Sequence, residues 1–435
     1  MAPPLTCGPG APQRRLLQAA ADGDLRLFKR IASVLDAGKG RIKEAVDAVR
    51  DRGATALHVA AGPGRMSVCK YLVEELDVDV DAADESGDTP LAYAVRFDSV
   101  NTVKYLLDHD ADPDKPDRNG STPLHLAAGG GNRDIVKLLL SKGANVDSFC
   151  RAGTPLHIAA YYKQDGTMKI LLDHRADCNK VFNGIFTPLM VALEAGSLKC
   201  VKLLIKAGAD VKGVGVTPLI IAAKKGLTNF YQCLLEAGAD PDVRDNFGLR
   251  PIEIAASHNR WRDVEILLPV TSRIPSVHDW SVDGVINYVQ SMPSVEDDPM
   301  YKMDPADIKL EASKAYERKD YVAAVKLYSM VANHRSADAT LFSDRSLCWL
   351  KMGEGDRALT DAQLCRMKRP RWSKACYLQG AAQMLLKDYG KACEAFLDGL
   401  KLDPTNVEID NALWEAVNCL KTAHAAKKMS ELSFA

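Results

Sequence analysis

The sequence predicts an all-α protein built from two consecutive arrays of short helical repeats. Three observations support this prediction. A Thr-Pro-Leu string recurs about every 33 residues in the first half of the chain, a pattern of small residues recurs every 34 residues towards the C-terminus, and aromatic residues make up only 6% of the 435 residues. A core with so few aromatic rings must be aliphatic and rich in alanine, which suits small helices that pack closely against their neighbours.

The first array consists of seven copies of one motif. Its Thr-Pro-Leu strings begin at Thr89, Thr122, Thr154, Thr187 and Thr217. Thr55-Ala56-Leu57 precedes them, Arg250-Pro251-Ile252 follows, and the steps between the copies are 34, 33, 32, 33, 30 and 33 residues. Threonine can cap the first helix of each copy, and proline suits its first turn, where the missing N–H costs nothing. The motif resembles the ankyrin repeat, whose period it shares.

The end of the second helix in each copy carries its own signal. A glycine before an Ala-Asp or Ala-Asn pair, such as Gly143, predicts a left-handed exit from that helix. His109 and Arg175 stand in place of this glycine in the second and fourth copies, so we expect less sharply turned helix ends there. The resemblance to ankyrin repeats implies a solenoid of paired helices, and residues 16–24 predict its N-terminal cap.

The second array is defined by small residues at fixed spacing. Ala324, Ala358 and Ala392 are separated by 34 and 34 residues, and each copy carries a further small residue, Ala312, Ser346 or Gly380. This pattern resembles tetratricopeptide repeats (TPR). A last helix with Ile409, Leu413, Val417 and Leu420 on one face predicts the cap helix of such an array. The order of the two arrays, and the strings FSDRSLCWLKMG and WSKACYLQGAA, resemble a plant family of ankyrin–TPR proteins, which implies a soluble interaction protein without specifying its partner.

The two arrays and the segments around them predict four parts of the chain. We expect a flexible N-terminus at residues 1–13 and an ankyrin-repeat domain, an N-cap plus about seven repeats, at residues 14–270. A proline-rich linker at residues 271–304 contains one short helix around Ile286, followed by an acidic, flexible tether. A TPR domain of three repeats plus the cap helix occupies residues 305–428.

Composition and charge narrow the function classes. Lysine plus arginine is 56 and aspartate plus glutamate is 57, so the formal net charge is 56 − 57 = −1. This balance argues against a nucleic-acid coat or a membrane-surface binder. No stretch approaches the roughly 18 apolar residues of a membrane span, and residues 1–12 lack the features of a secretory signal. Eleven cysteines without a CxxC string indicate a reducing compartment, so we expect the cytoplasm, with the nucleus as the alternative location.

No motif of an enzyme is present. The sequence has no HExxH, GxSxG or Walker string, so it predicts no catalytic residues, no cofactor and no metal site. His58, His125 and His157 follow three of the motif threonines at a fixed offset. Because no carboxylate or nucleophile accompanies them at a matching offset, we expect them to form structural hydrogen bonds within or between repeats.

The TPR groove poses the most specific chemical question. In chaperone-binding members of that family, Lys, Asn, Asn, Lys and Arg form a clamp for the C-terminal carboxylate of a partner. The resemblance places these positions on Lys309, Ser313, Asp344, Lys374 and Leu378. Only the lysines are kept, and Asp344 puts a negative charge where the carboxylate would bind, so we expect weak binding of chaperone tails. Two alternatives stay open: the five residues are simply solvated, or the groove takes an uncharged or basic peptide.

Basic residues gather at the turn between the second and third TPR repeats. They are Arg366, Lys368, Arg369, Arg371 and Lys374. Such a run is typical of a nuclear import signal or of a patch for an acidic partner. A solvated turn is the favoured interpretation.

Aromatic residues suggest a partner surface on the ankyrin array. Phe149 and Phe182 lie at predicted fingertips, and Tyr161 and Tyr162 lie at a predicted inner-helix end. Each ring alone is more often a local packing residue, but their grouping in the fourth and fifth repeats favours an interface. Helix ends such as Gly129-Gly130 would form a polar rim around it.

The sequence therefore predicts a non-enzymatic intracellular adaptor. Its ankyrin surface would bind one protein, and its TPR groove would bind a peptide of another, with a chaperone adaptor as a subset of this hypothesis. The alternative is a nuclear regulatory or transcription-associated subunit that uses the basic turn at residues 366–374.

Overall fold

The structure is a computed structural model that describes residues 11–182, 186–212, 217–245, 247–292, 303–332 and 338–433, with side chains up to residue 423. Within these residues the secondary structure is helical, apart from isolated bridges, which confirms the all-α prediction. The chain divides into two compact units, the first formed by residues 1–182 and 187–209 and the second by residues 183–186 and 210–435. Most of the predicted N-terminal segment (residues 1–10) and of the predicted tether (residues 293–302) lies outside the described residues.

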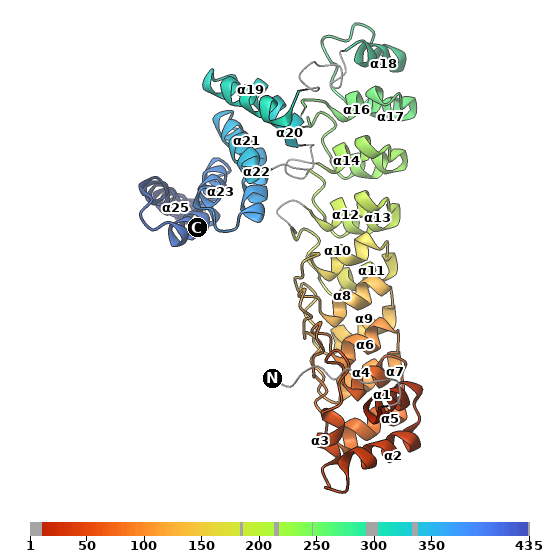
Figure 1. Cartoon of the computed structure of the whole chain (residues 1–435). Coiled ribbons are helices and arrows are strands. Elements are labelled where there is room, and N and C mark those ends of the chain that lie inside the picture. Colours follow the sequence, from red (N-terminus) through yellow and green to blue (C-terminus); the bar gives the residue numbers. More distant parts are fainter. Residues whose placement is uncertain are drawn as a thin grey trace. The chain divides into compact units, whose positions relative to one another are not determined.

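The first unit contains the N-cap and five repeats. The N-cap consists of α1 (Pro12–Asp22) and α2 (Leu25–Asp36), with the short α3 (Ile42–Asp47) after it. The repeats are the helix pairs α4 (Ala56–Ala61) and α5 (Met66–Lys70, continued by a π-helical turn Tyr71–Glu75), α6 (Pro90–Arg96) and α7 (Val100–Asp108), α8 (Pro123–Gly130) and α9 (Arg133–Ser141), α10 (Pro155–Tyr161) and α11 (Asp165–Asp173), and α12 (Pro188–Ala195) and α13 (Leu198–Lys206). Figure 1 shows them as two rows, in which each inner helix from α4 to α12 packs against the next inner helix.

Histidines close the caps of three inner helices. The Thr122 N–H donates to Nδ1 of His125 at 3.1 Å, and Nε2 of His125 donates to the carbonyl of Gly153 in the next repeat at 3.1 Å. His58 makes the corresponding bond to the carbonyl of Asp88 at 3.0 Å. Burial lowers the pKa of both histidines, which keeps the neutral ring that these bonds require. The predicted bonds within and between repeats are confirmed.

The exits of the outer helices differ from the prediction. Asp110, one residue after His109, and Arg175 both adopt left-handed backbone angles, with φ of 65° and 63°. They take the conformation of Gly143, whose φ is 88°. The expectation of less sharply turned helix ends at His109 and Arg175 is wrong. In the second copy Asp110, directly before Ala111, holds the place of the glycine, and in both copies the turn forms although a side chain raises its energy by roughly 1–2 kcal/mol.

Side chains at the start of the outer helices bond to the repeat before them. Each is the N-cap residue of an outer helix and donates to a carbonyl at the end of the preceding inner helix. The bonds run from Arg65 to Ala21 (2.8 Å), from Ser99 to Gly62 (2.6 Å), from Gln164 to Gly129 (3.2 Å) and, in the second unit, from Arg260 to Ala223. These bonds satisfy carbonyls that the helix itself leaves without a partner.

The second unit begins with two further repeats. They are α14 (Pro218–Lys225) with a 3₁₀ turn (Thr228–Phe230) and α15 (Tyr231–Glu236), and α16 (Pro251–Ser257) with α17 (Trp261–Leu267). The helix α18 (Val282–Ser291) follows and packs on α16 and α17. Its cap is Ser281, whose hydroxyl accepts from the Gly284 N–H at 3.0 Å, and its buried face includes Ile286 and Val289.

The TPR array consists of three helix pairs and a long last helix. They are α19 (Pro305–Glu317) and α20 (Tyr321–Ala332), α21 (Ala339–Lys351) and α22 (Gly355–Lys368), α23 (Ser373–Leu385) and α24 (Tyr389–Leu402), and α25 (Val407–Ser433). The alanines that defined the repeat are fully buried between paired helices, and a Cβ at Gly380 would overlap the ring of Phe396. The buried face of α25 runs through Ile409 and Ala416, whereas Leu413, Val417 and Leu420 are only half-buried.

Candidate functional site

The inner helices of the TPR array bring four of the five predicted groove residues together. Nζ of Lys309 on α19 donates to the Thr340 hydroxyl on α21 at 2.6 Å. Nζ of Lys374 on α23 lies 4.0 Å from a carboxylate oxygen of Asp344 on α21. The Ser313 hydroxyl lies close by and donates to the Lys309 carbonyl at 3.0 Å. Both groove lysines therefore already have partners on the neighbouring helix.

Asp344 is the unusual charge of this groove. Its side chain is 31% exposed, and burial raises the pKa of its carboxyl group although Lys374 and Lys309 act in the opposite direction. At neutral pH the carboxylate pairs with Lys374 and would repel a second carboxylate that approached the same lysine. The groove is arranged to satisfy its own charges, and it offers no amide at this position.

The structure corrects the prediction for Leu378. Its side chain is completely buried, so it does not line the groove. The corresponding arginine of a carboxylate clamp has a long side chain that can reach solvent, whereas a leucine at the same helical position turns into the core. Only Lys309, Ser313, Asp344 and Lys374 remain as candidate contacts for a peptide.

The basic turn is largely neutralised by its own domain. Three of its five cations form ion pairs with carboxylates of the TPR array. The pairs are Arg366–Asp398, Arg369–Asp338 (3.0 Å) and Lys374–Asp344 (4.0 Å). Lys368 lies over the ring of Phe342, at 5.7 Å from its centroid. These contacts favour the interpretation of a structural, solvated turn.

A buried ion pair, which the sequence pattern did not reveal, joins α21 and α22. The guanidinium of Arg345 donates to both carboxylate oxygens of Asp361 at 2.7 and 2.8 Å, and also to the Ser329 hydroxyl at 3.0 Å. The Trp349 indole N–H donates to the same carboxylate at 3.1 Å. The spacing of the sequence indicates that Arg345 is buried, because it lies three residues after Phe342 and four before Trp349 on one face of the helix, but it does not identify Asp361 as the partner.

The predicted aromatic surface of the ankyrin array is mostly exposed. The exposed fractions are 51% for Phe149, 65% for Tyr161 and 58% for Tyr162. The two tyrosine rings form an edge-to-face pair with centroids 5.1 Å apart. Phe182 is the exception, because it is only half-buried and its ring packs edge-on against His157 at 5.7 Å. We therefore assign Phe182 to local packing.

A hollow of about 440 Å³ lies beside this tyrosine pair, at the inner-helix ends of the second to fourth repeats. Gly129 and Gly130 belong to its lining together with Tyr162 and Ile158. A Cβ added to Gly129 would lie 3.1 Å from Ile158 and 3.4 Å from Tyr162. The prediction that Gly129-Gly130 forms a polar rim is wrong, because these residues expose bare backbone inside a hollow.

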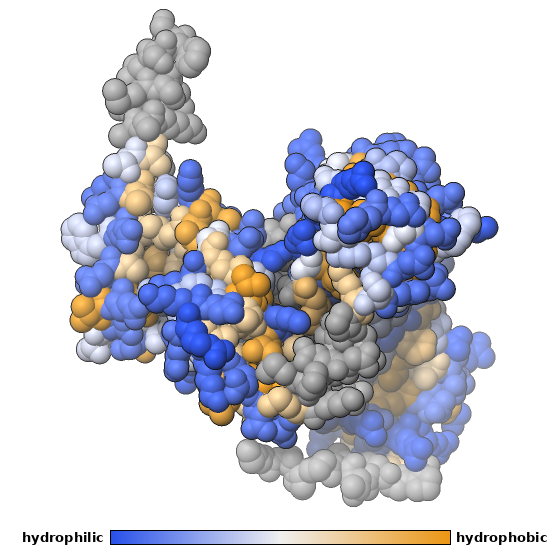
Figure 2. Space-filling view, turned by 90° about the horizontal axis from the view of Figure 1, so that it is seen from above, coloured by the Kyte–Doolittle hydropathy of each residue, from blue (hydrophilic) through white to orange (hydrophobic). Residues whose placement is uncertain are grey.

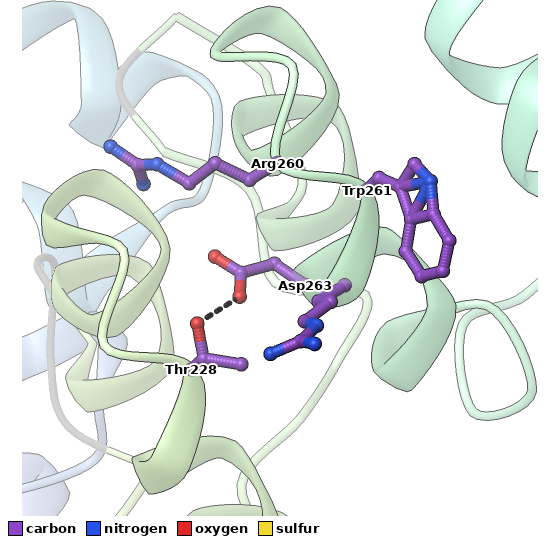
Figure 3. Close-up of a pocket in the computed structure, with 5 residues that line it drawn as sticks. Thr228, Arg260, Trp261 and Asp263 are labelled. Atoms are coloured by element: carbon purple, nitrogen blue, oxygen red, sulfur yellow. Dashed lines mark hydrogen bonds between the residues drawn. The ribbon is translucent and has the colours of Figure 1, made fainter.

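A second hollow, of about 430 Å³, lies beside the outer helix α17 in the second unit, and Figure 3 shows the residues that line it. The buried carboxylate of Asp263 accepts from the hydroxyls of Thr228 at 2.6 Å and Tyr231 at 3.2 Å. Burial, and after it the charge of Asp263, holds the pKa of Tyr231 far above its ordinary value. Arg260 is turned towards backbone carbonyls of the preceding helix. Trp261, which is 53% exposed, points away from this carboxylate in Figure 3. The polar groups here satisfy one another.

The described residues contain neither a candidate membrane-spanning helix nor a candidate metal site. In that part of the chain no helix combines the length and the apolar character needed to cross a bilayer. No group of three or more His, Cys, Asp or Glu side chains has a metal-binding arrangement among the same residues. The face shown in Figure 2 is largely hydrophilic, with apolar residues gathered in separate patches.

Comparison with known proteins gives matches for both arrays. The family described as "Ankyrin repeats (3 copies)" matches residues 16–117, 109–182, 153–215 and 189–276. The family described as "Serine/threonine-protein kinase BSK1-like, TPR repeats" matches residues 294–380. Both kinds of repeat are protein-interaction modules.

Several curated proteins and solved structures are similar over part of the chain. The Hsp70-Hsp90 organizing protein of Triticum aestivum is 30% identical over 131 residues, which is 30% of this chain and 22% of that protein. The Hsp70-Hsp90 organizing protein 3 of Arabidopsis thaliana is 32% identical over 123 residues, covering 28% and 22%. The chain thus spans about a fifth of the length of these relatives. The ankyrin repeat domain of Bcl-3 is 28% identical with a TM-score of 0.45 and covers 50% of this chain and 99% of that one.

The ankyrin matches carry the classification. Together they run from residue 16 to residue 276 and so cover more than half of the 435 residues. They coincide with the N-cap, the seven repeats and the start of the segment before α18. The chain therefore belongs to the ankyrin-repeat family and carries a BSK1-like TPR domain C-terminal to its ankyrin array.

Proposed function

We propose that this chain is a non-enzymatic adaptor that holds two protein partners, one on its ankyrin surface and one as a peptide in its TPR groove. The observation that carries the proposal is the exposed edge-to-face pair of Tyr161 and Tyr162 in a chain that is only 6% aromatic. Exposed tyrosines bury large area with few rotamers to freeze and are enriched among interface hot spots. Binding both partners at once would raise their effective concentration for each other.

The ankyrin side is tested by affinity purification with the full chain. Replacing Tyr161 and Tyr162 by alanine should weaken capture of the ankyrin partner by at least about 2 kcal/mol, roughly thirtyfold, if both are hot spots. Phe182→Ala is left out of this variant because its ring packs on His157. Exposed substitutions usually change stability by less than about 0.5 kcal/mol, so the thermal transition should stay in place. Unchanged capture by the folded double variant would contradict the proposal.

The TPR side concerns a chaperone link. The relatives are by name Hsp70-Hsp90 organizing proteins, and two clamp lysines are kept here. A carboxylate tail would have to displace Thr340 from Lys309 and Asp344 from Lys374. Because a charge-assisted bond contributes about 1.5–3 kcal/mol, losing one such contact weakens binding by roughly ten- to a hundredfold. We propose that acidic chaperone tails bind weakly and that the physiological peptide has another chemistry.

A titration of the full chain with an acidic tail peptide tests this point. The Ser313→Asn, Asp344→Asn double variant should bind the peptide at least about tenfold more tightly, because it restores two amides and removes the repelling charge. Leu378→Arg does not belong in this variant, because residue 378 is buried. Asp356→Asn, an exposed charge removal outside the groove, is the matched control. Tight binding by the unmodified chain, lost when the peptide C-terminus is amidated, would contradict the proposal.

We propose a cytoplasmic location for this adaptor. The alternative, a nuclear regulatory subunit, would need the basic turn to be available, but three of its five cations have partners inside the domain. Fractionation of the tagged full chain decides between the two. Nuclear enrichment that disappears when Lys368 and Arg371 are replaced would favour the alternative.

A further inference from the structure

The hollow beside Tyr162 has a floor made of helix backbone. Gly129 and Gly130 end the inner helix α8, where each glycine is roughly 1 kcal/mol less favourable than alanine. A Cβ at Gly130 would meet no atom within 4 Å, so the space above it is open. All lining residues belong to the first compact unit. Because these two glycines have no side chains, the hollow above them has room for a side chain of another protein.

The walls of the hollow are apolar and aromatic. Val95 and Leu126 line it from the second and third repeats, and Ile158 and Tyr162 from the fourth. Tyr162 is 58% exposed although it packs over Gly129. An aliphatic or aromatic side chain placed on the glycine floor would contact these groups and bury them.

The charged residues that line the hollow are Arg96 and Asp98. Arg96 lines the hollow but is neutralised by Asp88 at 2.9 Å. Asp98 also lines it, is exposed, and accepts only from the neutral amide of Asn132 at 3.1 Å among the bonds described for it. Burial raises the pKa of the Asp88 carboxyl group, Arg96 acts in the opposite direction, and the charges of Asp84 and Asp117 add to the rise.

We propose that this hollow receives a basic amphipathic segment of the ankyrin partner, with one apolar side chain on Gly129 and Gly130 against Tyr162 and a flanking lysine or arginine paired with Asp98. The inference rests on the proposed binding function of the ankyrin surface and names the chemistry of its partner. Apolar burial supplies affinity in such a contact, and the carboxylates supply orientation and discrimination against acidic segments.

Fluorescence anisotropy with the full chain tests the inference. The probe is a fluorescein-labelled synthetic peptide with a leucine–phenylalanine pair flanked by lysines. One comparison peptide carries glutamates in place of the lysines, and another carries two serines in place of the apolar pair. We expect both comparison peptides to bind at least about tenfold more weakly, and the affinity of the lysine peptide to fall as salt rises from about 50 to about 200 mM.

Two variants locate the binding. Gly130→Leu fills the hollow and should weaken the lysine peptide by about tenfold, whereas Gly390→Leu on α24, where a Cβ also meets no atom within 4 Å, should not. Asp98→Asn should weaken binding severalfold and reduce its salt dependence, with Asp356→Asn as control. Equal binding of the lysine and glutamate peptides, or unchanged binding by folded Gly130→Leu, would overturn the inference. If the Tyr161, Tyr162 double variant still loses its partner in that case, the adaptor proposal stands without it.

Discussion

Replacing Asp361 by leucine should destabilise the TPR array by about 3–5 kcal/mol. The substitution leaves the guanidinium of Arg345 buried without a counter-charge, and removing one member of a buried pair has this magnitude. The geometry argues for the upper part of the range. The pair is bidentate at 2.7 and 2.8 Å, the exposed fractions of Arg345 and Asp361 are 6% and 3%, and Trp349 loses its acceptor as well.

The double variant Arg345→Met, Asp361→Leu separates a lost pair from lost packing. It removes both charges and fills the space with apolar side chains of similar volume. Buried pairs replaced in this way are often neutral in stability. We therefore expect the double variant to recover most of the loss and to lie within about 2 kcal/mol of the wild type, with Ser329 and Trp349 left without partners.

Hydrogen exchange of the full chain under increasing urea provides the assay. Amides of α21 and α22 report the free energy of opening of the TPR array separately from that of the ankyrin array. Glu311→Ala is the control, because the Lys314–Glu311 pair is short, 2.6 Å, but solvent-exposed, and its loss should leave the stability of the array nearly unchanged. The reasoning fails if Asp361→Leu costs as little as Glu311→Ala, or if the double variant costs the sum of the two single variants.

Three further predictions concern the ankyrin turns, the histidine caps and the thiols. Arg175→Gly should raise the free energy of unfolding by about 0.5 kcal/mol, since glycine relieves the left-handed conformation but adds entropy to the unfolded chain; a melting temperature unchanged or lowered in Arg175→Gly would contradict this. Lowering the pH from about 7.5 to about 5.5 should destabilise the first unit by up to about 1.4 kcal/mol per pH unit for each of His58 and His125. In the folded protein the pKa of each of these histidines lies below 6.5, the ordinary value for histidine, so the unfolded chain binds protons at a higher pH than the folded one. The free energy of unfolding in urea should therefore depend less steeply on pH in His125→Gln than in the wild type. Burial raises the pKa of Cys69 and Cys348 to about 12, so iodoacetamide at pH 8 should label the half-buried Cys419 before Cys69 and Cys348; rapid labelling of Cys69 in the native chain would refute this.

The repeats could be predicted because the same local problem is solved many times. Each inner helix needs a cap, a proline-compatible first turn and small residues against its neighbour, and these needs recur in the sequence with the same spacing. The inner helices α4, α6, α8, α10, α12 and α14 therefore each begin directly after a motif threonine, and α16 begins after Arg250. The TPR pairs follow for the same reason, since Ala324, Ala358 and Ala392 mark the close approach of helices.

The candidate sites were less predictable, because a motif gives the position of a residue but not the direction of its side chain. Leu378 holds a groove position and is buried, and Phe182 holds a fingertip position and packs on His157. The left-handed turn at Asp110 shows the converse, since tertiary packing imposes a backbone conformation that the residue itself disfavours. The Arg345–Asp361 pair depends on two helices meeting, which no single periodicity encodes.

The bonds between successive ankyrin repeats have a consequence for how such arrays accumulate substitutions. Arginine, serine and glutamine perform the same task at Arg65, Ser99 and Gln164, because a backbone carbonyl requires only a donor of sufficient reach. Chemically unrelated residues can thus occupy this N-cap position. The backbone carbonyl that accepts their hydrogen bond is present in every repeat, because it does not depend on the side chain of the accepting residue. The N-cap residues of the outer helices can therefore be substituted while the hydrogen bond to the preceding repeat is kept. A comparison of repeats by residue identity would score this position as random, although Arg65, Ser99 and Gln164 make the same bond.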